Sequence, residues 1–417
     1  VARLHAHNEE SGAVTLALAL AGCGVMGRRH VRGLQKLKGI GRQRFDLVAV
    51  CDPNDANAQQ LADLAHEILG RRPQIFGSLD DLIRNMSVDA LAITTSPEFH
   101  AGLGIAALQA GVHVLVEKPI ALTIRQGRDL VAVSRQCGRK LAVAENYRRD
   151  PINRLAKALI DVGAIGRPVL AIQSSAGWGE QVIITPWRHQ KRACGIAIDM
   201  GVHYTDILEY LLGPVERVGG LGTVVDTVRR DSAGQEHPAD AEDLVIGVMR
   251  FASGALGNLV LHLAGRGQEH FTRLVYGTGG SLSIPGDRTG QPLGLTLRDG
   301  SDRPVPESEQ LALVPSFALD PTTAALFGGE RLTSYTMPWA DIDASLLAIE
   351  QDDFAEAILT GREPEVTGEM GLRSLALIYG FLESDRLGQF ITTDALLSRD
   401  DLPYQAEIEG VLAGGRP

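Results

Sequence analysis

The sequence has few cysteines and no excess of basic charge. Its four cysteines, Cys23, Cys51, Cys137 and Cys194, stand singly among 417 residues, a distribution that is neither a disulfide framework nor a metal-binding spacing. We therefore expect reduced thiols and a cytoplasmic protein. Lys and Arg total 40 against 51 Asp and Glu, which gives a net charge of -11. A chain this acidic is not expected to bind nucleic acid or an anionic membrane.

Long apolar runs and two common catalytic motifs are also missing. No segment is apolar over the length that a membrane helix needs. Leu20-Ala21-Gly22-Cys23 resembles a lipoprotein cleavage site, but the residues before it hold a single basic side chain, Arg3, which argues against a signal peptide. There is no H-E-x-x-H zinc motif, so we expect no metal. The absence of a G-x-S-x-G motif disfavours a serine hydrolase.

The composition is that of an ordinary globular protein. Hydrophobic residues make up 44% of the chain and charged residues 22%, which excludes a disordered or fibrous protein. The chain is too long for one ordinary core, so we expect two domains.

Strands and helices alternate in the first part of the chain. A continuous apolar run of strand length, as at residues 14–21, is typical of a strand buried on both faces of a parallel sheet. The alternation predicts an α/β domain with a doubly wound parallel sheet. Further strands are expected at residues 45–51, 90–94, 113–116 and 141–144, and helices at 54–69, 97–110 and 124–136.

The pattern changes after about residue 149, where strands follow one another with few helices between them. Such an order predicts an α+β domain with a large, open, mainly antiparallel sheet. We expect strands at residues 169–174, 215–225, 244–251, 254–263 and 271–276, helices at 152–161, 196–212, 345–360 and 370–387, and long loops over 285–340. The expected division is an N-terminal extension (1–13), a first α/β domain (14–148) and a second α+β domain (149–417), whose last helices are candidates to pack back on the first.

Gly22-Cys23-Gly24-Val25-Met26-Gly27 is a G-x-G-x-x-G motif. Its context is a buried strand before it and a helix after it, which is where such a loop binds a dinucleotide pyrophosphate. Asp52 ends the next strand and is expected to bind the adenosine ribose. No Lys or Arg lies between Asp52 and Glu67 to meet a 2′-phosphate, so we expect NAD, with NADP less favoured.

Other polar residues follow later strands of the same sheet. Thr94, Thr95, Ser96 and Pro97 end a parallel strand, where open α/β sheets bind ligands; Ser96 and Pro97 equally suit a helix N-terminus. His100 is equally consistent with a contact to the cofactor and with an ordinary polar position of the helix.

Two further groups carry candidate chemistry. Lys118 follows a buried strand, so it is solvated or paired; it could polarise a substrate oxygen or form a salt bridge with Glu117. Asp199 and His203 lie four residues apart, hence on one helix face. A histidine with a nearby carboxylate is a common general base, although such a pair is also frequently structural.

The ordered series of motifs resembles the glucose-fructose oxidoreductase, inositol dehydrogenase and rhizopine-catabolism (Gfo/Idh/MocA) family. The resemblance covers most of residues 14–390. The residues that carry it are Gly22 to Gly27 with His30, Val88-Asp89-Ala90, Thr95-Ser96-Pro97 with His100, residues 110–119 (AGVHVLVEKP), residues 144–148 (AENYR), residues 165–168 (IGRP), Trp187-Arg188, Asp199-Met200-Gly201-Val202-His203 with Asp206, and residues 366–387.

The resemblance implies NAD(P)-dependent redox chemistry at a ring carbon of a sugar, glycoside or cyclitol, and a homodimer or homotetramer formed through the open sheet. It makes residues 14–148 a NAD-binding Rossmann domain and residues 149–417 a substrate-binding and oligomerisation domain. It implies that Lys118, Asp199 and His203 are catalytic. The cofactor would contact Gly22, Gly24, Val25, Met26, Gly27, Asp52, Thr94, Thr95, Ser96, Pro97, His100, Glu117, Lys118 and Asn146, and the substrate Lys118, Tyr147, Arg148, Trp187, Arg188, Asp199 and His203.

In the mechanism that we expect, His203 takes a proton from a ring hydroxyl, Lys118 hydrogen-bonds the reacting oxygen, and Asp199 orients His203 or anchors a neighbouring hydroxyl. Family members often have a glycine run where this chain has Ala193-Cys194-Gly195-Ile196, so substrate choice does not carry over. Two alternatives remain open at this level. One is a redox-neutral glycosidase, lyase or epimerase that recycles its NAD, and the other is a non-catalytic regulator that senses NAD or a sugar.

Overall fold

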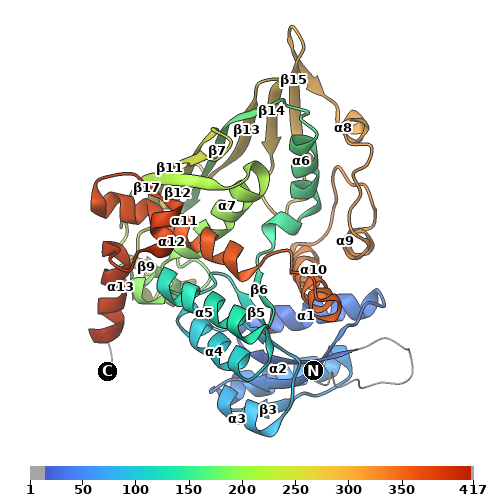
Figure 1. Cartoon of the computed structure of the whole chain (residues 1–417), viewed down its shortest axis with the longest axis vertical. Coiled ribbons are helices and arrows are strands. Elements are labelled where there is room, and N and C mark those ends of the chain that lie inside the picture. Colours follow the sequence, from blue (N-terminus) through green and yellow to red (C-terminus); the bar gives the residue numbers. More distant parts are fainter. Residues whose placement is uncertain (1–14, 415–417) are drawn as a thin grey trace.

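The computed structural model describes residues 15–414. The expected N-terminal extension at residues 1–13 lies outside the described residues. Two sheets dominate the molecule, a smaller one built early in the chain and a larger one built later (Figure 1). Among the described residues, no helix has both the length and the apolar character needed to cross a membrane.

The first sheet is parallel and has six strands in the order β3-β2-β1-β4-β5-β6. In β1, leucines pack against α1 and α2 on one face, and Ala19 and Ala21 pack into the core on the other. This two-sided burial confirms the predicted Rossmann sheet. The strands are β1 (Leu16–Ala21), β2 (Phe45–Cys51), β3 (Gln74–Phe76), β4 (Ala90–Ile93), β5 (His113–Glu117) and β6 (Leu141–Ala144), and the helices α1 (Val25–Gly39), α2 (Asp55–Leu69), α3 (Leu79–Asn85), α4 (Pro97–Gln109) and α5 (Ile124–Cys137).

The second sheet has nine strands in the order β16-β15-β14-β13-β7-β12-β11-β8-β17. All neighbours are antiparallel except β12 and β7, which confirms the mainly antiparallel sheet. Its strands are β7 (Pro168–Trp178), β8 (Val215–Thr223), β11 (Leu244–Phe251), β12 (Leu256–Gly265), β13 (His270–Gly277), β14 (Gly280–Ile284), β15 (Gly294–Arg298), β16 (Asp302–Val305) and β17 (Ile391–Thr392); β9 (Val228–Arg230) and β10 (Glu236–Pro238) form a separate hairpin.

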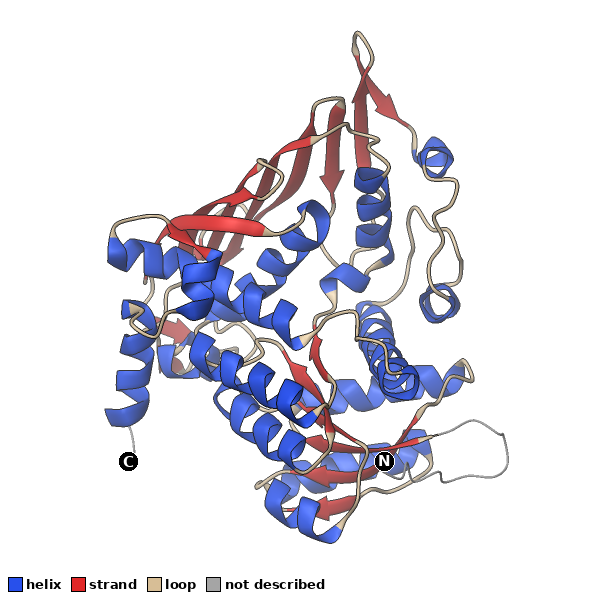
Figure 2. Cartoon of the chain, in the orientation of Figure 1, coloured by secondary structure: helices blue, strands red, loops and turns tan. Residues whose placement is uncertain are grey.

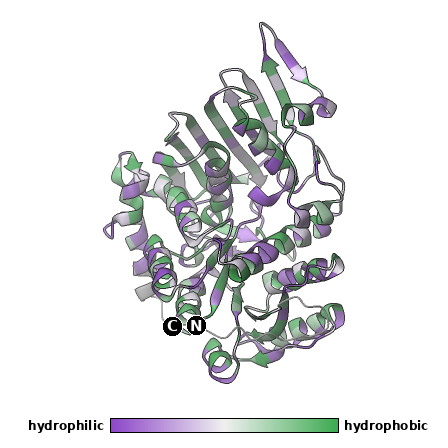
Figure 3. Cartoon of the chain, turned by 45° about the vertical axis from the view of Figure 1, so that its right-hand side comes forward, coloured by the Kyte–Doolittle hydropathy of each residue, from purple (hydrophilic) through white to green (hydrophobic). Residues whose placement is uncertain are grey.

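Helices cover one face of this large sheet (Figure 2). These are α6 (Pro151–Asp161), α7 (Ile196–Leu212) and α11 (Gly368–Leu387). Apolar and polar residues alternate along the strands (Figure 3), as expected where the two faces of a sheet meet different surroundings. On the other face, strand residues such as Ile246 and Val248 are exposed.

The structure corrects the sequence-based expectation for residues 285–340. Instead of long loops alone, the segment contains β15, β16, α8 (Glu307–Leu313) and α9 (Pro321–Phe327). The helix expected from residue 345 begins earlier, as α10 (Trp339–Thr360). Helix α10 packs along α1 of the first sheet, as Figure 1 shows. The chain ends in α12 (Thr393–Ser398) and α13 (Pro403–Gly414).

Candidate active site

The glycine loop between β1 and α1 is shaped by the lack of side chains at its three glycines. A Cβ on Gly22 would come within 2.7 Å of the Thr95 nitrogen, and one on Gly27 within 2.3 Å of the Gly22 carbonyl oxygen. A Cβ on Gly24 would meet no protein atom within 4 Å. Gly24 also caps α1 without a side-chain hydrogen bond. The loop thus packs tightly at its ends and leaves room at its centre, which fits a pyrophosphate at a helix N-terminus.

Asp52 braces this loop. One carboxylate oxygen accepts a hydrogen bond from the Cys23 backbone N–H at 2.7 Å, and the other accepts from the Asn54 N–H at 2.8 Å. Asp52 also lines the cavity in front of the loop. Each carboxylate oxygen has a further lone pair, so Asp52 can hold the loop and still accept from ribose hydroxyls.

A cavity of about 510 Å³ lies in front of the glycine loop. Its size and its position at the carboxyl ends of parallel strands fit a dinucleotide. The residues predicted from sequence that line it are Gly22, Gly24, Val25, Met26, Asp52, Thr94, Thr95, Ser96, Trp187 and Arg188; Gly27, Pro97, His100, Glu117, Lys118 and Asn146 are not among its lining residues.

Thr94, which lines the cavity, and His100, which does not, both brace the loops around it. The Thr94 hydroxyl donates to the Gly22 carbonyl at 2.6 Å. The His100 ring lies between the carbonyls of Pro119, at 2.8 Å from Nδ1, and Thr95, at 3.0 Å from Nε2. Burial lowers the pKa of His100. His100 therefore ties the loop after β4 to the loop after β5.

Glu117 is held by His30, with 2.9 Å between Oε1 and Nε2. Burial would raise the pKa of Glu117, but His30 and Lys118 hold it below its usual value. The Lys118 side chain points away from Glu117, so the salt bridge weighed between these neighbours does not form through Nζ.

Lys118 reaches across to α7. Its Nζ lies 2.9 Å from both the backbone oxygen and Oδ1 of Asp199. Arg188 Nε donates to the other carboxylate oxygen at 3.2 Å. Burial would raise the pKa of Asp199, but Lys118 and Arg188 hold it far below its usual value. The Asp199 carboxylate therefore stays charged and fixes both cations.

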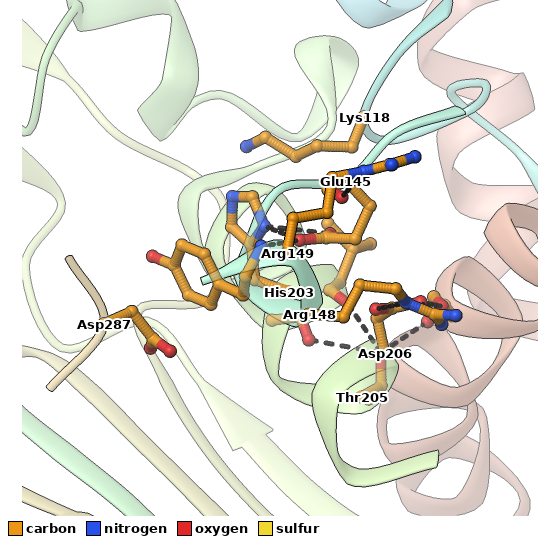
Figure 4. A network of polar contacts seen from close by, with 12 residues as sticks. Lys118, Glu145, Arg148, Arg149, His203, Thr205, Asp206 and Asp287 are labelled. Carbon is orange, nitrogen blue, oxygen red and sulfur yellow. Dashed lines mark hydrogen bonds and ion pairs between the residues drawn. The ribbon is translucent and has the colours of Figure 1, made fainter. Parts of the chain in front are cut away.

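His203 is oriented by Glu145 and not by Asp199, which corrects that part of the expected mechanism. Its Nδ1 lies 2.8 Å and 2.9 Å from the two Glu145 oxygens, and the Tyr147 ring stacks on the imidazole with centroids 4.1 Å apart. Burial would raise the pKa of Glu145, but His203 and Lys118 hold it below its usual value. Figure 4 shows Lys118, Glu145 and His203 gathered together.

From the sequence, Glu145 is part of the segment 144–148 (AENYR) that resembles the family, but no role was predicted for it. It is separated from His203 by 58 residues, so no local spacing connects the two. The available signal was position: Glu145 directly follows β6, at the same sheet edge as Lys118 after β5. Charged residues at the carboxyl ends of parallel strands are candidates for ligand binding or catalysis.

A second cavity, of about 440 Å³, lies toward the large sheet. Its aromatic residues can pack on a sugar face. Two of its charged residues are paired, Asp287 with Arg273 and Arg288 with Asp343, whereas the exposed Glu269 forms no ion pair with another described residue. Its lining residues are Tyr147, Ser175, Ala176, Gly177, Trp178, Met200, Tyr204, Glu269, His270, Phe271, Gly286, Asp287 and Arg288.

Lys118, Asp199 and His203 lie between these two cavities. Arg188, bonded to Asp199, lines the first, and Tyr147, stacked on His203, lines the second. Asn146 is buried with an Oδ1 that finds no partner among the described residues, as expected where a ligand amide would complete its bonding.

Arg148 is not brought to this group. Its guanidinium pairs with Asp206 at 2.8 Å and 2.5 Å, as Figure 4 shows.

Within residues 15–414, no group of three or more His, Cys, Asp or Glu side chains is placed to hold a metal ion.

Comparison with known families gives two matches. A family described as "Oxidoreductase family, NAD-binding Rossmann fold" matches residues 16–145, and the "GFO/IDH/MocA C-terminal domain" matches residues 153–283. Together they cover more than half of the chain.

Among curated proteins, the chain is similar to D-apiose dehydrogenase of Paraburkholderia graminis, with 27% identity over 91% of this chain and 90% of that protein. It is similar to levoglucosan dehydrogenase of Pseudarthrobacter phenanthrenivorans, with 30% identity over 53% of this chain and 62% of that one. For scyllo-inositol 2-dehydrogenase (NAD⁺) of Bacillus subtilis, identity is 28% over 64% and 72%.

Solved structures share the fold. Levoglucosan dehydrogenase in complex with NADH and levoglucosan has a TM-score of 0.73 at 23% identity, covering 91% of this chain and 99% of that one. An Agrobacterium radiobacter oxidoreductase in complex with NAD⁺, L-tartaric acid and magnesium has a TM-score of 0.72 at 21% identity, covering 92% and 100%.

Proposed function

This chain belongs to the GFO/IDH/MocA family of oxidoreductases, and from that premise we propose that it oxidises a ring hydroxyl of a neutral sugar, glycoside or cyclitol with NAD. The relatives named above are dehydrogenases of a sugar, an anhydrosugar and a cyclitol, which supports this substrate class. The aromatic rings of the second cavity and the ion pairs of Asp287 and Arg288 also suit a neutral polyol, from whose hydroxyls Glu269 can accept hydrogen bonds.

One observation carries the proposal. Lys118, from the loop after β5, and His203, from α7, converge between a cavity that fits a dinucleotide and a cavity that fits a sugar. Oxidation of a hydroxyl by a nicotinamide releases a proton, so a group that accepts the proton and a group that hydrogen-bonds the oxygen belong where the two would meet.

The cofactor supplies one part of the chemistry: bound NAD accepts a hydride at its nicotinamide. His203 takes the hydroxyl proton at Nε2, for which no hydrogen bond to another described residue is found. Nδ1 then donates to the Glu145 carboxylate, which stabilises the imidazolium. Lys118 Nζ donates to the reacting oxygen and stabilises its developing negative charge. Asp199 holds Lys118 and Arg188 in place.

The cofactor site would be formed by the loop Gly22 to Gly27, by Asp52 and by Thr94 to Ser96, with Glu117 and Asn146 near the nicotinamide end. Asp52 lines the cavity as a carboxylate, which favours the ribose hydroxyls of NAD over the 2′-phosphate of NADP. Trp187 and Arg188 would lie between cofactor and substrate.

We also propose a division after residue 148 into a Rossmann domain (14–148) and a second domain (149–417), and a cytoplasmic homodimer or homotetramer. Free cysteines, of which Cys23, Cys51 and Cys194 are buried, support a reducing compartment. One face of the large sheet is covered by no helix of residues 15–414, and Leu221, Ile246, Val248 and Leu256 are exposed there on three neighbouring strands, which supports oligomerisation.

The test is a substrate panel. Purified protein and NAD are mixed with neutral sugars, glycosides and inositols, and the absorbance of reduced nicotinamide is followed. We expect a signal with one class that is lost in His203→Gln. NAD that stays bound while substrate disappears without a signal would instead favour redox-neutral chemistry. Bound NAD with every substrate unchanged would favour a sensor.

A further inference from the structure

An ion-paired bridge connects the two cavities on a path separate from Lys118 and Asp199. It consists of Arg29, Asp343 and Arg288. Arg29 lies on α1 and lines the cofactor cavity. Its Nε donates to Asp343 Oδ2 at 2.6 Å, and its terminal nitrogen pairs with Oδ1. Asp343 lies on α10 and is 3% exposed.

The same carboxylate binds Arg288, which lines the second cavity. Arg288 approaches Asp343 Oδ1 at 3.1 Å. Asp343 therefore joins a helix of the first sheet to the loop after β14. A buried carboxylate shared by two guanidinium groups has little freedom to move, because a shift toward either cation would weaken its contact with the other.

Arg288 is held on several sides. Its guanidinium carbon lies 5.3 Å from the Tyr147 ring centroid and 5.4 Å from that of Trp339. Its backbone has a φ of 63°, a conformation that is uncommon for a residue with a side chain. The Arg288 N–H donates to Asp150 Oδ2 at 3.0 Å, which helps to fix that conformation.

Tyr147 connects Arg288 to the His203 imidazole. The Tyr147 and His203 rings stack with an interplanar angle of 11°, and an Arg288 terminal nitrogen lies 3.4 Å from the Tyr147 hydroxyl. Glu145 fixes one ring nitrogen of His203, but a contact at one edge leaves the ring free to tilt about it. The stacked Tyr147 ring restrains that tilt.

We infer that Arg29, Asp343 and Arg288 are positioning residues that hold the His203 ring through Tyr147. The inference rests on the proposed function, in which His203 Nε2 takes the substrate proton. Asp343 and Arg29 would then influence the reaction without touching the reacting atoms.

The test uses the His203 imidazole as a probe. The imidazole proton signals of the folded protein are recorded without substrate, and His203 is assigned among the 11 histidines by comparison with His203→Gln. A proton above an aromatic face is shielded, so we expect the His203 signal to move downfield in Asp343→Asn. Arg288→Gln provides a second variant, in which the carboxylate keeps Arg29 as a partner.

Arg42→Gln is the matched control. It removes another ion pair between the first sheet and α10, in which Arg42 lies 3.1 Å from Asp352, but Arg42 lines neither of the two cavities. We expect its His203 signal to stay in place. Turnover should fall by about tenfold or more in Asp343→Asn and Arg288→Gln. Because Asp343 also holds Arg29, which lines the cofactor cavity, turnover is compared at saturating NAD.

Two results would overturn the inference: an unmoved His203 signal in both bridge variants, or a moved signal with unchanged turnover. If the wild type proves inactive toward every substrate, the proposed function fails. The His203 signal then decides alone whether the bridge orders the imidazole.

Discussion

At the scale of single residues, Lys118 and His203 are each tied to a carboxylate from a distant part of the chain. Asp199 holds Lys118, and Glu145 holds His203. Both carboxylates are buried, yet their cationic neighbours keep both pKa values below the usual ones. The Asp199 and Glu145 carboxylates therefore stay charged over the pH range in which most enzymes work.

Lys118→Ala removes the amine that we place on the reacting oxygen. We expect turnover to fall by about 10²-fold to 10⁴-fold, with the dissociation constant of NAD little changed, because Lys118 is not among the residues that line the cofactor cavity. Titration with NAD and steady-state rates measure the two quantities. Lys140→Ala, which removes an amine paired with an exposed Glu363, is the control, and equal rates in the two variants would contradict the role of Lys118.

Glu350 is a buried carboxyl group whose two oxygens find no partner among the described residues. Burial raises its pKa well above the usual value; Glu117 and Glu145 add to this, while Arg149 opposes it. A folded pKa above the unfolded one stabilises the fold below the unfolded pKa, and that contribution is lost as pH rises.

Glu350→Gln removes this titration. We therefore expect the free energy of unfolding of the variant, relative to the wild type, to increase between pH 5 and pH 8, with a limiting slope of about 1.4 kcal/mol per pH unit. Denaturant unfolding at several pH values measures it. Glu356→Gln, on the same helix but partly exposed and paired with Arg44, should show no such slope. A difference for Glu350→Gln that does not change with pH would contradict the prediction.

At the scale of elements, the glycines in the turn from β1 into α1 have different roles. Gly24→Ala would place a methyl group in open space before the cofactor cavity. We expect the fold to tolerate it and the affinity for NAD to fall by about tenfold or more, equal to about 1.4 kcal/mol. Gly27→Ala would meet the Gly22 carbonyl and should cost about 1–3 kcal/mol of stability. Melting temperatures and NAD titrations of the two variants separate these effects, and equal losses of stability would refute them.

Five of the six strands of the first sheet were predictable because their signals are local, whereas β3 has only three residues and was not predicted. Each buried strand forms a continuous apolar run, and each following helix has its own periodicity. Helix α10 was harder to predict, because Asp343, Glu350 and Gln351 are polar but buried, which obscures its apolar face. Strands β15 and β16 are short, and β16 is the edge strand and includes Pro304, so their sequence is typical of a loop.

The residues of the site were easier to predict than the contacts between them. The glycine loop, Lys118 and the Asp199 and His203 pair follow strand ends or share a helix, which spacing reveals. The contact between Glu145 and His203 joins β6 to α7, and the turn of Arg148 toward Asp206 depends on packing. Such contacts depend on tertiary structure, which local patterns do not encode.

At the scale of the whole molecule, the large sheet is covered by helices on one face only among the described residues. A Cβ on Gly247 of β11 would meet the Phe381 ring of α11, so Ile246 and Val248 on either side of it face away from the helices. Exposed branched residues on neighbouring strands are typical of an interface.

Val248→Asp places a charge on this face. We expect the oligomer to dissociate in sedimentation experiments, because an unpaired charge is costly in an apolar interface. Val162→Asp, at an equally exposed apolar position after α6, should leave the assembly intact. A wild type that sediments as a monomer would contradict the proposed oligomer.

The central claim is that this chain transfers a hydride from a ring carbon of a neutral sugar or cyclitol to NAD. The most direct measurement is the stoichiometry of one reaction, with reduced nicotinamide and lost substrate quantified in the same samples over time. The account predicts equal amounts of both at every time point, and loss of both in Lys118→Ala. Substrate loss without reduced nicotinamide would contradict net oxidation.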